Sequence, residues 1–332
     1  MLRIGLIGSG YAAAHHARAL TRLAREGVAT LAAVYSREIR RVEELARRHG
    51  ASPCPTLEAF WEADLDAVDI CTPTPTHAFY ALEAIRRGKH VLVEKPIART
   101  LAEAEAMVAA AQEAGVVLMV AHEQRFEPDC RRAWELVRAG ALGRLCMARQ
   151  VIAGPYPDWS IDNWFADFAQ SGGPLLDLAI HSLDYFNWLF DSLPFRIYAI
   201  GARRHLPFED HVVAVLRYPD GGLAWVEASW AMPTGSPLIV RTELIGTEGI
   251  LQWDSEETAS LEVWKDGGAR QAWAPAAEDG FTAEIRHFAE CVARGTPPQV
   301  RPEEAIGALR TALAAIAALA AGHPVRLEEV SG

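Results

Sequence analysis

The sequence has few cysteines, and they are scattered. Five occur in 332 residues, at positions 54, 71, 130, 146 and 291, and none forms a C-x-x-C pair. An odd number without paired spacing argues against a disulfide framework and against a cysteine-based zinc site. We therefore expect a reducing, cytoplasmic location and no metal site.

The sequence also lacks an excess of positive charge and a long apolar run. Its net charge of -11 argues against nucleic acid or an anionic membrane as a partner, because both need a basic face. The longest apolar stretch, residues 311–321, is about half of the ~20 residues that a membrane span needs. The N-terminal segment has no long apolar core or cleavage site typical of a signal peptide. We expect neither a nucleic acid nor a membrane partner.

Half of the residues are apolar, and the length suits two domains. Up to about residue 122, short apolar runs alternate with longer helical patterns, which is typical of βαβ units and a parallel sheet. The runs are apolar nearly throughout, as expected of strands with helices on both faces. We expect strands at 3–7, 30–35, 67–71, 90–93 and 116–120, and helices at 12–25, 38–48, 77–87 and 101–114.

The pattern changes from about residue 144. Alternating runs at 211–218, 223–231 and 239–245 are separated by glycine-containing turns, which indicates antiparallel strands. Two helical segments, 281–294 and 302–321, close the chain. Residues 1–122 hold 14 basic and 14 acidic side chains, so the net negative charge lies entirely in the second part. An anionic ligand is therefore more favourable in the first part.

A glycine-rich segment follows the first expected strand and opens the first expected helix. A glycine at its first position allows a tight turn, and a second lets backbone approach a pyrophosphate at the helix N-terminus. The surrounding βα units make this a predicted dinucleotide-binding site rather than a bare glycine turn. Its cofactor-binding residues are Gly8, Ser9, Gly10, Tyr11 and Ala12, with Ala13 allowing close helix packing.

Cofactor choice is expected at the end of the second strand, where an acidic residue would bind the ribose 2′-hydroxyl of NAD. The sequence has Ser36 and Arg37 there, followed by Arg40 and Arg41. Arginines at a helix N-terminus oppose the helix dipole, whereas an adenosine 2′-phosphate would attract them. The alternative is a set of surface arginines from a biased composition, since only three of 32 basic residues are lysines. We predict NADP or NAD, with NADP favoured.

Two further loops follow the strands at 67–71 and 90–93. Ligands of α/β sheets bind at the carboxyl ends of strands, so both loops should face the cofactor. Lys95 precedes a proline, which excludes helical geometry and makes a cis bond possible. An isolated Lys-Pro is usually a solvated loop, but here its place after a strand favours a role in the site. The predicted cofactor-binding residues are Thr72, Pro73, Thr74, His77, Glu94 and Lys95.

The second part contains an acid–histidine pair. Asp177 and His181 are four residues apart in the apolar run 175–190 and would share a helix face, so that the carboxylate can orient the imidazole. Hydride transfer from an alcohol needs a base for the hydroxyl proton and an electrophile for the developing alkoxide, which histidine and lysine can supply. Taken alone, such a pair is more often structural.

Together these motifs resemble those of the Gfo/Idh/MocA oxidoreductases, and the resemblance runs nearly end to end. The Glu-Lys-Pro segment and the Asp-x-x-x-His pair are its most specific parts. The acid after the second strand is absent, and Glu123-Gln124 stand where the family often has Asn before Arg-Phe. The matching segments are Gly8-x-Gly10-x-x-Ala13, Cys71-Thr72-Pro73-Thr74-x-x-His77, Glu94-Lys95-Pro96, Gln124-Arg125-Phe126, Gly172-Gly173-x-x-x-Asp177-x-x-x-His181 and Phe288 to Pro297.

The resemblance implies an α/β protein with an N-terminal Rossmann domain over residues 1–122. Residues 123–332 would form an α/β domain with a large, open, mainly antiparallel sheet for substrate binding and for homodimer or homotetramer contacts. The reaction would be NAD(P)-dependent hydride transfer at a CH-OH or C=O group of a sugar, inositol or related polyol. Lys95 would bind the reacting oxygen, His181 would act as acid/base, and Asp177 would orient the site.

Other interpretations remain open. Arg125 and Trp164 are candidate substrate contacts, but Arg125 could equally cap a loop and Trp164 could belong to a local aromatic core. Some relatives use a retained NAD to cleave glycosides, and the same architecture occurs in a non-enzymatic, NADP-binding regulator. The regulator should lack the lysine and histidine that are present here.

Overall fold

The computed structural model describes residues 1–255, 261–265, 270–273 and 278–330. Its contacts divide the chain into two compact units: unit 1 comprises residues 1–126 and 278–306, and unit 2 comprises residues 127–277 and 307–332. The sequence places every residue after 122 in the second domain, whereas residues 123–126 and 278–306 belong to unit 1. The latter segment belongs to unit 1 because its helix α10 (Gly280–Arg294) packs against α1 (Tyr11–Arg25), where Arg286 pairs with Glu26.

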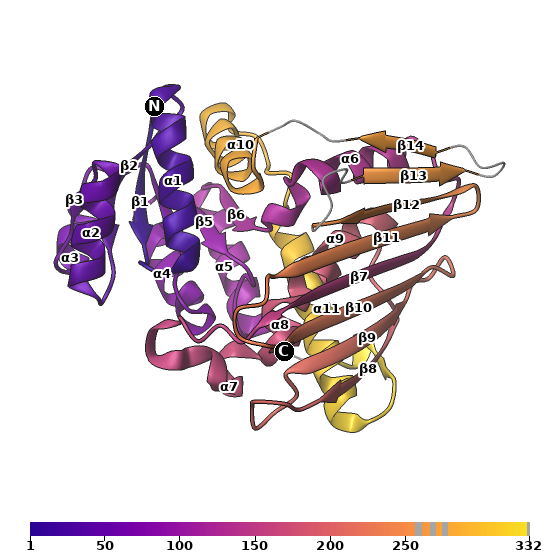
Figure 1. The fold of residues 1–332 in the computed structure, drawn as a ribbon. Coiled ribbons are helices and arrows are strands. Elements are labelled where there is room, and N and C mark those ends of the chain that lie inside the picture. Colours follow the sequence, from indigo (N-terminus) through magenta and orange to yellow (C-terminus); the bar gives the residue numbers. More distant parts are fainter. Residues whose placement is uncertain (256–260, 266–269, 274–277, 331–332) are drawn as a thin grey trace. The chain divides into compact units, whose positions relative to one another are not determined.

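Unit 1 is built on a six-stranded parallel sheet, which confirms the predicted doubly wound fold (Figure 1). The strand order is β3-β2-β1-β4-β5-β6, so the chain moves outward from β1 and then starts again on its other side at β4. Ligands bind at the carboxyl ends of the strands beside such a switch point. The strands are β1 (Leu2–Ile7), β2 (Ala29–Tyr35), β3 (Ser52–Pro53), β4 (Ala67–Ile70), β5 (His90–Glu94) and β6 (Leu118–Ala121).

The helices of unit 1 begin and end where the sequence provides caps. In α5 (Leu101–Ala114), Thr100 and Glu103 form a capping box, and Gly115 ends the helix in the left-handed conformation. The sequence prediction missed β3 and α3, because β3 has two exposed residues and α3 has a single turn. The other elements are α2 (Ile39–His49), α3 (Leu57–Trp61), α4 (His77–Arg86), η1 (Thr74–Thr76) and η2 (Glu123–Arg125).

Unit 2 is built on a nine-stranded sheet with the order β14-β13-β12-β11-β7-β10-β9-β8-β15. Only β7 and β10 pair in parallel, so the predicted antiparallel character is confirmed. The strands are β7 (Leu145–Pro155), β8 (Arg196–Ala202), β9 (His211–Arg217), β10 (Leu223–Met232), β11 (Ile239–Gly246), β12 (Gly249–Asp254), β13 (Leu261–Lys265), β14 (Arg270–Trp273) and β15 (Val325–Arg326).

The two faces of this sheet differ. Helix α9 (Ala179–Phe190) packs on β7 and β10, and the residues that face it are buried. On the opposite face, Tyr198, Val215 and Trp225 form one cross-strand row and are exposed by 37%, 38% and 41%. The remaining elements are α6 (Pro128–Arg138), η3 (Ile161–Ala166), α7 (Phe168–Ser171), α8 (Gly173–Asp177), α11 (Pro302–Ala321) and η4 (Leu327–Glu329).

Helix α11 is the one described helix that is long and apolar enough to cross a membrane, and half of its most apolar window is buried inside the protein. Ala308, Leu309, Ala312 and Ala315 are fully buried on it. A core helix of this length passes the same test, and the burial of these residues fits a packed helix.

Candidate functional site

The turn between β1 and α1 has the geometry of a phosphate-binding loop. Gly8 has φ +131°, and a Cβ there would lie 2.2 Å from the carbonyl oxygen of Cys71, so only glycine fits. Gly10 precedes the first turn of α1, and a Cβ there would meet no described atom within 4 Å. No described side chain caps this helix. Its N-terminal amides and open approach therefore fit a pyrophosphate.

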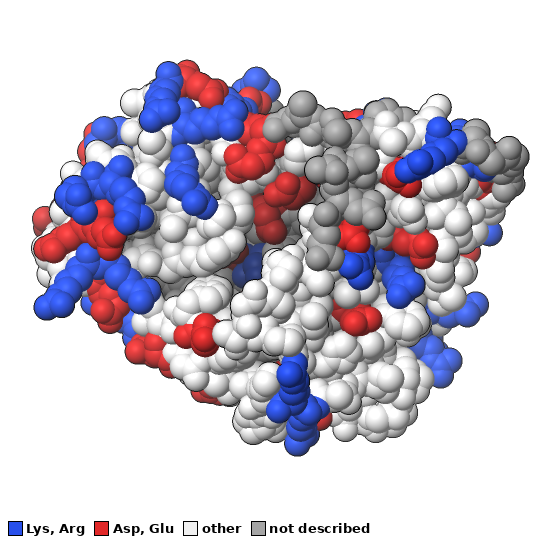
Figure 2. Space-filling view, viewed as in Figure 1, with Lys and Arg blue, Asp and Glu red and all other residues white. Residues whose placement is uncertain are grey.

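The end of β2 adjoins this turn. The hydroxyl oxygens of Ser9 and Ser36 are 2.8 Å apart, so the two loops are linked. Arg37 and Arg41 are exposed, and the first turn of α2 contains no acidic residue. On the face shown in Figure 2, basic side chains gather over the region of α1 and α2, interleaved with acidic ones. Arg37 and Arg41 follow the carboxyl end of β2, and their role in binding a 2′-phosphate stays a prediction.

The loops after β4 and β5 are joined by one buried histidine. His77 Nδ1 lies 2.9 Å from the carbonyl oxygen of Pro96, and Nε2 lies 2.8 Å from that of Thr72. Burial lowers the pKa of His77, and the two carbonyls oppose this only in part. The Lys95–Pro96 bond is cis, and Lys95 is half-buried. His77 thus holds the Lys95 loop beside the loop after β4.

The other predicted residues of these loops take different positions. Thr74 is buried, whereas Pro73 is partly exposed. Thr72 Oγ1 accepts a hydrogen bond from the Thr76 hydroxyl. Glu94 is 8% exposed and faces the interior of unit 1. His77 and Glu94 therefore support the loop from inside. Their predicted contact with the cofactor stays a prediction.

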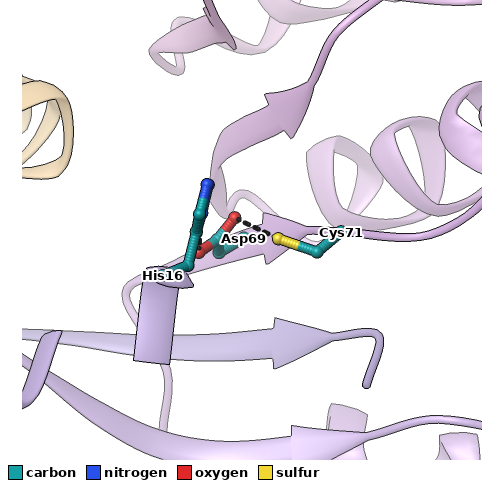
Figure 3. Close-up of side chains that lie close together, drawn as sticks. All are labelled: His16, Asp69 and Cys71. Carbon is teal, nitrogen blue, oxygen red and sulfur yellow. Dashed lines mark hydrogen bonds and ion pairs between the residues drawn. The ribbon is translucent and has the colours of Figure 1, made fainter. Parts of the chain in front are cut away.

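A buried cluster of ionisable groups lies behind these loops, and the sequence did not predict it. His16 from α1 and Asp69 from β4 are fully buried, with His16 Nδ1 2.9 Å from Asp69 Oδ2. The Cys71 thiol donates to Asp69 Oδ1 at 3.5 Å (Figure 3). The signal was present: Asp69 is a charged residue inside an otherwise apolar strand, and such a residue needs a buried partner.

The same three residues are the one group of described side chains whose positions could hold a metal ion, with ligand atoms within 4.8 Å of one another. The 2.9 Å separation of His16 Nδ1 and Asp69 Oδ2 is that of a direct hydrogen bond. Two ligands on one Zn²⁺, with bonds of about 2.0–2.1 Å, would lie about 3.3 Å apart in a tetrahedron. The geometry therefore fits a proton between these atoms better than an ion.

Helix α10 adds an acid to this cluster. Glu284 is fully buried, and neither carboxyl oxygen has a hydrogen-bond partner among the described residues. Burial raises its pKa well above 4.5, although the charge of His16 opposes the shift. Burial therefore favours the neutral form of the Glu284 carboxyl group.

In unit 2, Asp177 and His181 lie on two consecutive helices rather than on one. Asp177 ends α8, and His181 lies in the first turn of α9, so the predicted single helix over residues 175–190 divides at Leu178. Gly172, with φ +68°, leads into α8, and a Cβ there would lie 2.6 Å from the Leu176 side chain. Leu178 itself has right-handed helical backbone angles, φ -90° and ψ -52°. The roles of Asp177 and His181, and their meeting with Lys95, stay predictions.

The two candidate substrate contacts lie in packed surroundings. Arg125, in unit 1, is 1% exposed, and its guanidinium lies 2.6 Å from Glu304. Trp164 stacks on Phe165 at 4.1 Å, within an aromatic cluster centred on Phe165, Phe208 and Trp230. These contacts favour the structural alternatives that the sequence left open, and no finding tests substrate binding by either residue.

Comparison with known proteins decides the family. Residues 2–122 match the family model GFO_IDH_MocA, "Oxidoreductase family, NAD-binding Rossmann fold", and residues 130–252 match the "GFO/IDH/MocA C-terminal domain". The chain belongs to the Gfo/Idh/MocA family. This confirms the resemblance seen in the sequence, and the Gfo/Idh/MocA chain is an NAD(P)-dependent oxidoreductase.

Individual relatives of this Gfo/Idh/MocA protein cover nearly the whole chain. It is 29% identical to scyllo-inositol 2-dehydrogenase (NAD(+)) of Bacillus subtilis, over 87% of this chain and 86% of that one. It is 31% identical to D-xylose 1-dehydrogenase (NADP(+)) 2 of Haloferax volcanii, over 90% and 92%. The crystal structure of GenD2 from gentamicin A biosynthesis, in complex with NAD, superposes with a TM-score of 0.85 at 29% identity, covering 98% of this chain and 96% of GenD2.

Proposed function

We propose that this oxidoreductase is a dehydrogenase or reductase of sugars, inositols or related polyols, with NADP favoured over NAD. The observation that carries the proposal is Lys95, a half-buried lysine directly after β5 at the carboxyl edge of the Rossmann sheet, in a loop tied by His77 to the loop after β4. Relatives named for inositol and xylose oxidation support the substrate class.

Lys95, His181 and Asp177 have different roles in the proposed hydride transfer. When bound, the nicotinamide cofactor accepts or supplies the hydride. The Lys95 ammonium donates a hydrogen bond to the substrate oxygen and stabilises the negative charge that develops there. His181 takes the hydroxyl proton during oxidation and returns it during reduction, while Asp177 orients the site.

The cofactor site distinguishes the two nicotinamide cofactors through its surface arginines. Arg37 and Arg41 would pair with an adenosine 2′-phosphate, which NAD lacks. The named relatives include both an NAD and an NADP enzyme, so the arginines of this chain carry the preference.

We also propose a homodimer or homotetramer in the cytoplasm. The exposed row of Tyr198, Val215 and Trp225 gives the open sheet face an apolar surface that a second copy would cover. All five cysteines are free thiols, which suits a reducing compartment. We expect the binding partner to be a small sugar-like substrate, and neither a nucleic acid nor a membrane.

The test is substitution of Lys95. We expect Lys95→Met to lower kcat/KM by about a hundredfold or more on the best polyol of a panel, followed by the absorbance of reduced nicotinamide. The control is Lys89→Met, because Lys89 precedes the same strand and its ammonium binds the Leu65 carbonyl. Equal activity of the two variants, with cofactor binding intact, would refute the role of Lys95.

A further inference from the structure

Three buried ionisable side chains of unit 1 form a connected series that ends at the backbone of Lys95. His16 Nδ1 lies 2.9 Å from Asp69 Oδ2, and His16 Nε2 lies 3.2 Å from Glu94 Oε1. The other oxygen of Glu94, Oε2, accepts the backbone N–H of Lys95 at 3.0 Å. We propose that His16 is a positioning residue, which holds Glu94 in place and so fixes where Lys95 leaves strand β5. The inference rests on the proposed function, in which Lys95 acts on the substrate.

The sheet register explains why these residues meet. Asp69 of β4 pairs with Leu92 of β5, so the two side chains project from the same face. Glu94 lies two residues beyond Leu92 and shares that face. His16 lies on α1, which follows β1, the strand next to β4. One helix residue can therefore reach an acid on each of two neighbouring strands.

The charges favour a protonated imidazole between two carboxylates. Burial alone lowers the pKa of His16, but the charges and hydrogen bonds of Asp69 and Cys71 together outweigh it and raise the pKa well above 6.5. Burial alone likewise raises the pKa of Glu94, but its interactions with His16 and Lys95 lower it overall. The imidazole thus lies between two carboxylates, with a hydrogen bond to Asp69 and a 3.2 Å charge contact with Glu94, and a buried charge in such a place tolerates little displacement.

Helix α10 covers the cluster. The Phe281 ring meets the His16 ring edge-on, with centroids 5.5 Å apart. Burial raises the pKa of Glu284, on the same helix, which disfavours a further negative charge beside Glu94. The Glu94 carboxylate contacts the imidazole through Oε1 and the Lys95 amide through Oε2.

The first experiment observes the Lys95 amide directly. The chain contains three lysines, Lys89, Lys95 and Lys265, so [15N]lysine labelling gives three backbone signals. We expect His16→Asn, whose short amide can reach Asp69 but not Glu94, to shift the Lys95 signal and speed its hydrogen exchange at least about tenfold. His16→Gln places an amide N–H where Nε2 was and should restore slow exchange. Lys89 and Lys265 are internal references.

The second experiment measures turnover on the best polyol. His16→Asn should lower kcat at least about tenfold while KM changes less than about threefold, and His16→Gln should recover most of the loss. The control is Thr21→Ala on the same helix, which removes the 2.8 Å bond to His49 and should lower the melting temperature without moving the Lys95 signal. If His16→Asn does not fold, Asp69→Asn loosens the same pair and should move the same signal.

The outcomes separate the possibilities. A selective change at Lys95 that His16→Gln reverses supports the positioning role. Loss of stability with an unchanged Lys95 signal, or equal defects in both His16 variants, overturns it in favour of core packing. One equivalent of tightly bound zinc that His16→Asn releases also overturns it. If wild-type protein turns over no polyol but the Lys95 signal responds as expected, the proposed function fails and the positioning of Lys95 stands.

Discussion

Replacing each of the two glycines of the β1–α1 turn by alanine is expected to have a different effect: Gly8→Ala should lower stability, and Gly10→Ala should weaken cofactor binding. In Gly8→Ala, the new Cβ would lie 2.2 Å from the Cys71 carbonyl oxygen, against 3.4–4 Å for ordinary contact, at a φ of +131°. Such a backbone conformation alone costs about 1–3 kcal/mol in a residue other than glycine. The clash is with backbone, so no side-chain rotation relieves it. We expect a loss of about 2 kcal/mol or more, which lowers the melting temperature by roughly 4–8 °C.

Gly10→Ala should leave stability almost unchanged, because its Cβ would meet no described atom within 4 Å and alanine differs from glycine at this cap by well under 2 kcal/mol. The methyl group would instead stand where a pyrophosphate approaches the amides of α1. We expect the Kd for NADPH to rise at least about tenfold, or about 1.4 kcal/mol.

Thermal melting and a fluorescence titration with NADPH measure both effects on the same samples. Gly27→Ala is a further control, since Gly27 combines a positive φ, like that of Gly8, with open space, like that around Gly10, and lies at the other end of α1. A Gly10→Ala protein that binds NADPH as tightly as wild type would refute phosphate binding at this turn. A Gly8→Ala protein of unchanged stability would refute the close contact with Cys71.

Three other predictions concern cofactor choice, pH and assembly. The double variant Arg37→Ala, Arg41→Ala should weaken NADPH binding at least about tenfold and change NADH binding less than about twofold. The control Arg47→Ala, at the far end of α2, should change the binding of neither cofactor. Equal losses of affinity for both cofactors would contradict binding of the 2′-phosphate by Arg37 and Arg41. Burial raises the pKa of Glu284, so above pH 4.5 the folded protein binds more protons than the unfolded protein. The free energy of unfolding therefore falls as pH rises, and Glu284→Gln removes this pH dependence. The melting temperature of Glu284→Gln, relative to that of wild type, should therefore rise from roughly pH 5 to pH 8. A difference in melting temperature that does not change with pH would refute the raised pKa of Glu284. Trp225→Glu should reduce the mass measured by light scattering to that of a monomer. The control Trp159→Glu, at an exposed tryptophan outside the sheet, should leave the mass unchanged. An unchanged mass for Trp225→Glu would exclude the exposed sheet face around Trp225 as the interface.

The sequence predicted what depends on local pattern. Apolar strands, helical periodicity and the glycine turn located β1, β2, β4, β5 and β6 within a few residues, because buried parallel strands cannot carry polar side chains without partners. Alternation predicted β9, β10 and β11 for the same reason. The short elements β3 and α3 have too few residues to leave a periodic signal.

The sequence could not predict contacts between segments far apart in the chain. Residues 278–306 read as part of the second domain, and long-range contacts such as the packing of α10 on α1 place them in unit 1. His16 lies in an alanine-rich helix whose pattern does not mark it as charged, and its partners are 53 and 78 residues away. The pair Asp177 and His181 fits helix spacing, but spacing does not reveal the break at Leu178. The internal contacts of Glu94 and His77 that hold the two loops likewise join segments far apart in the chain, and their predicted cofactor contacts stay predictions.

The most direct test of the central claim is a double-mutant cycle on Lys95 and His181. If both groups act on the same substrate oxygen during hydride transfer, their effects on kcat are strongly non-additive. We predict that Lys95→Met with His181→Asn turns over a polyol within about threefold of the slower single variant. Losses that multiply, so that the double variant falls by the product of the two single effects, would contradict a shared reacting oxygen.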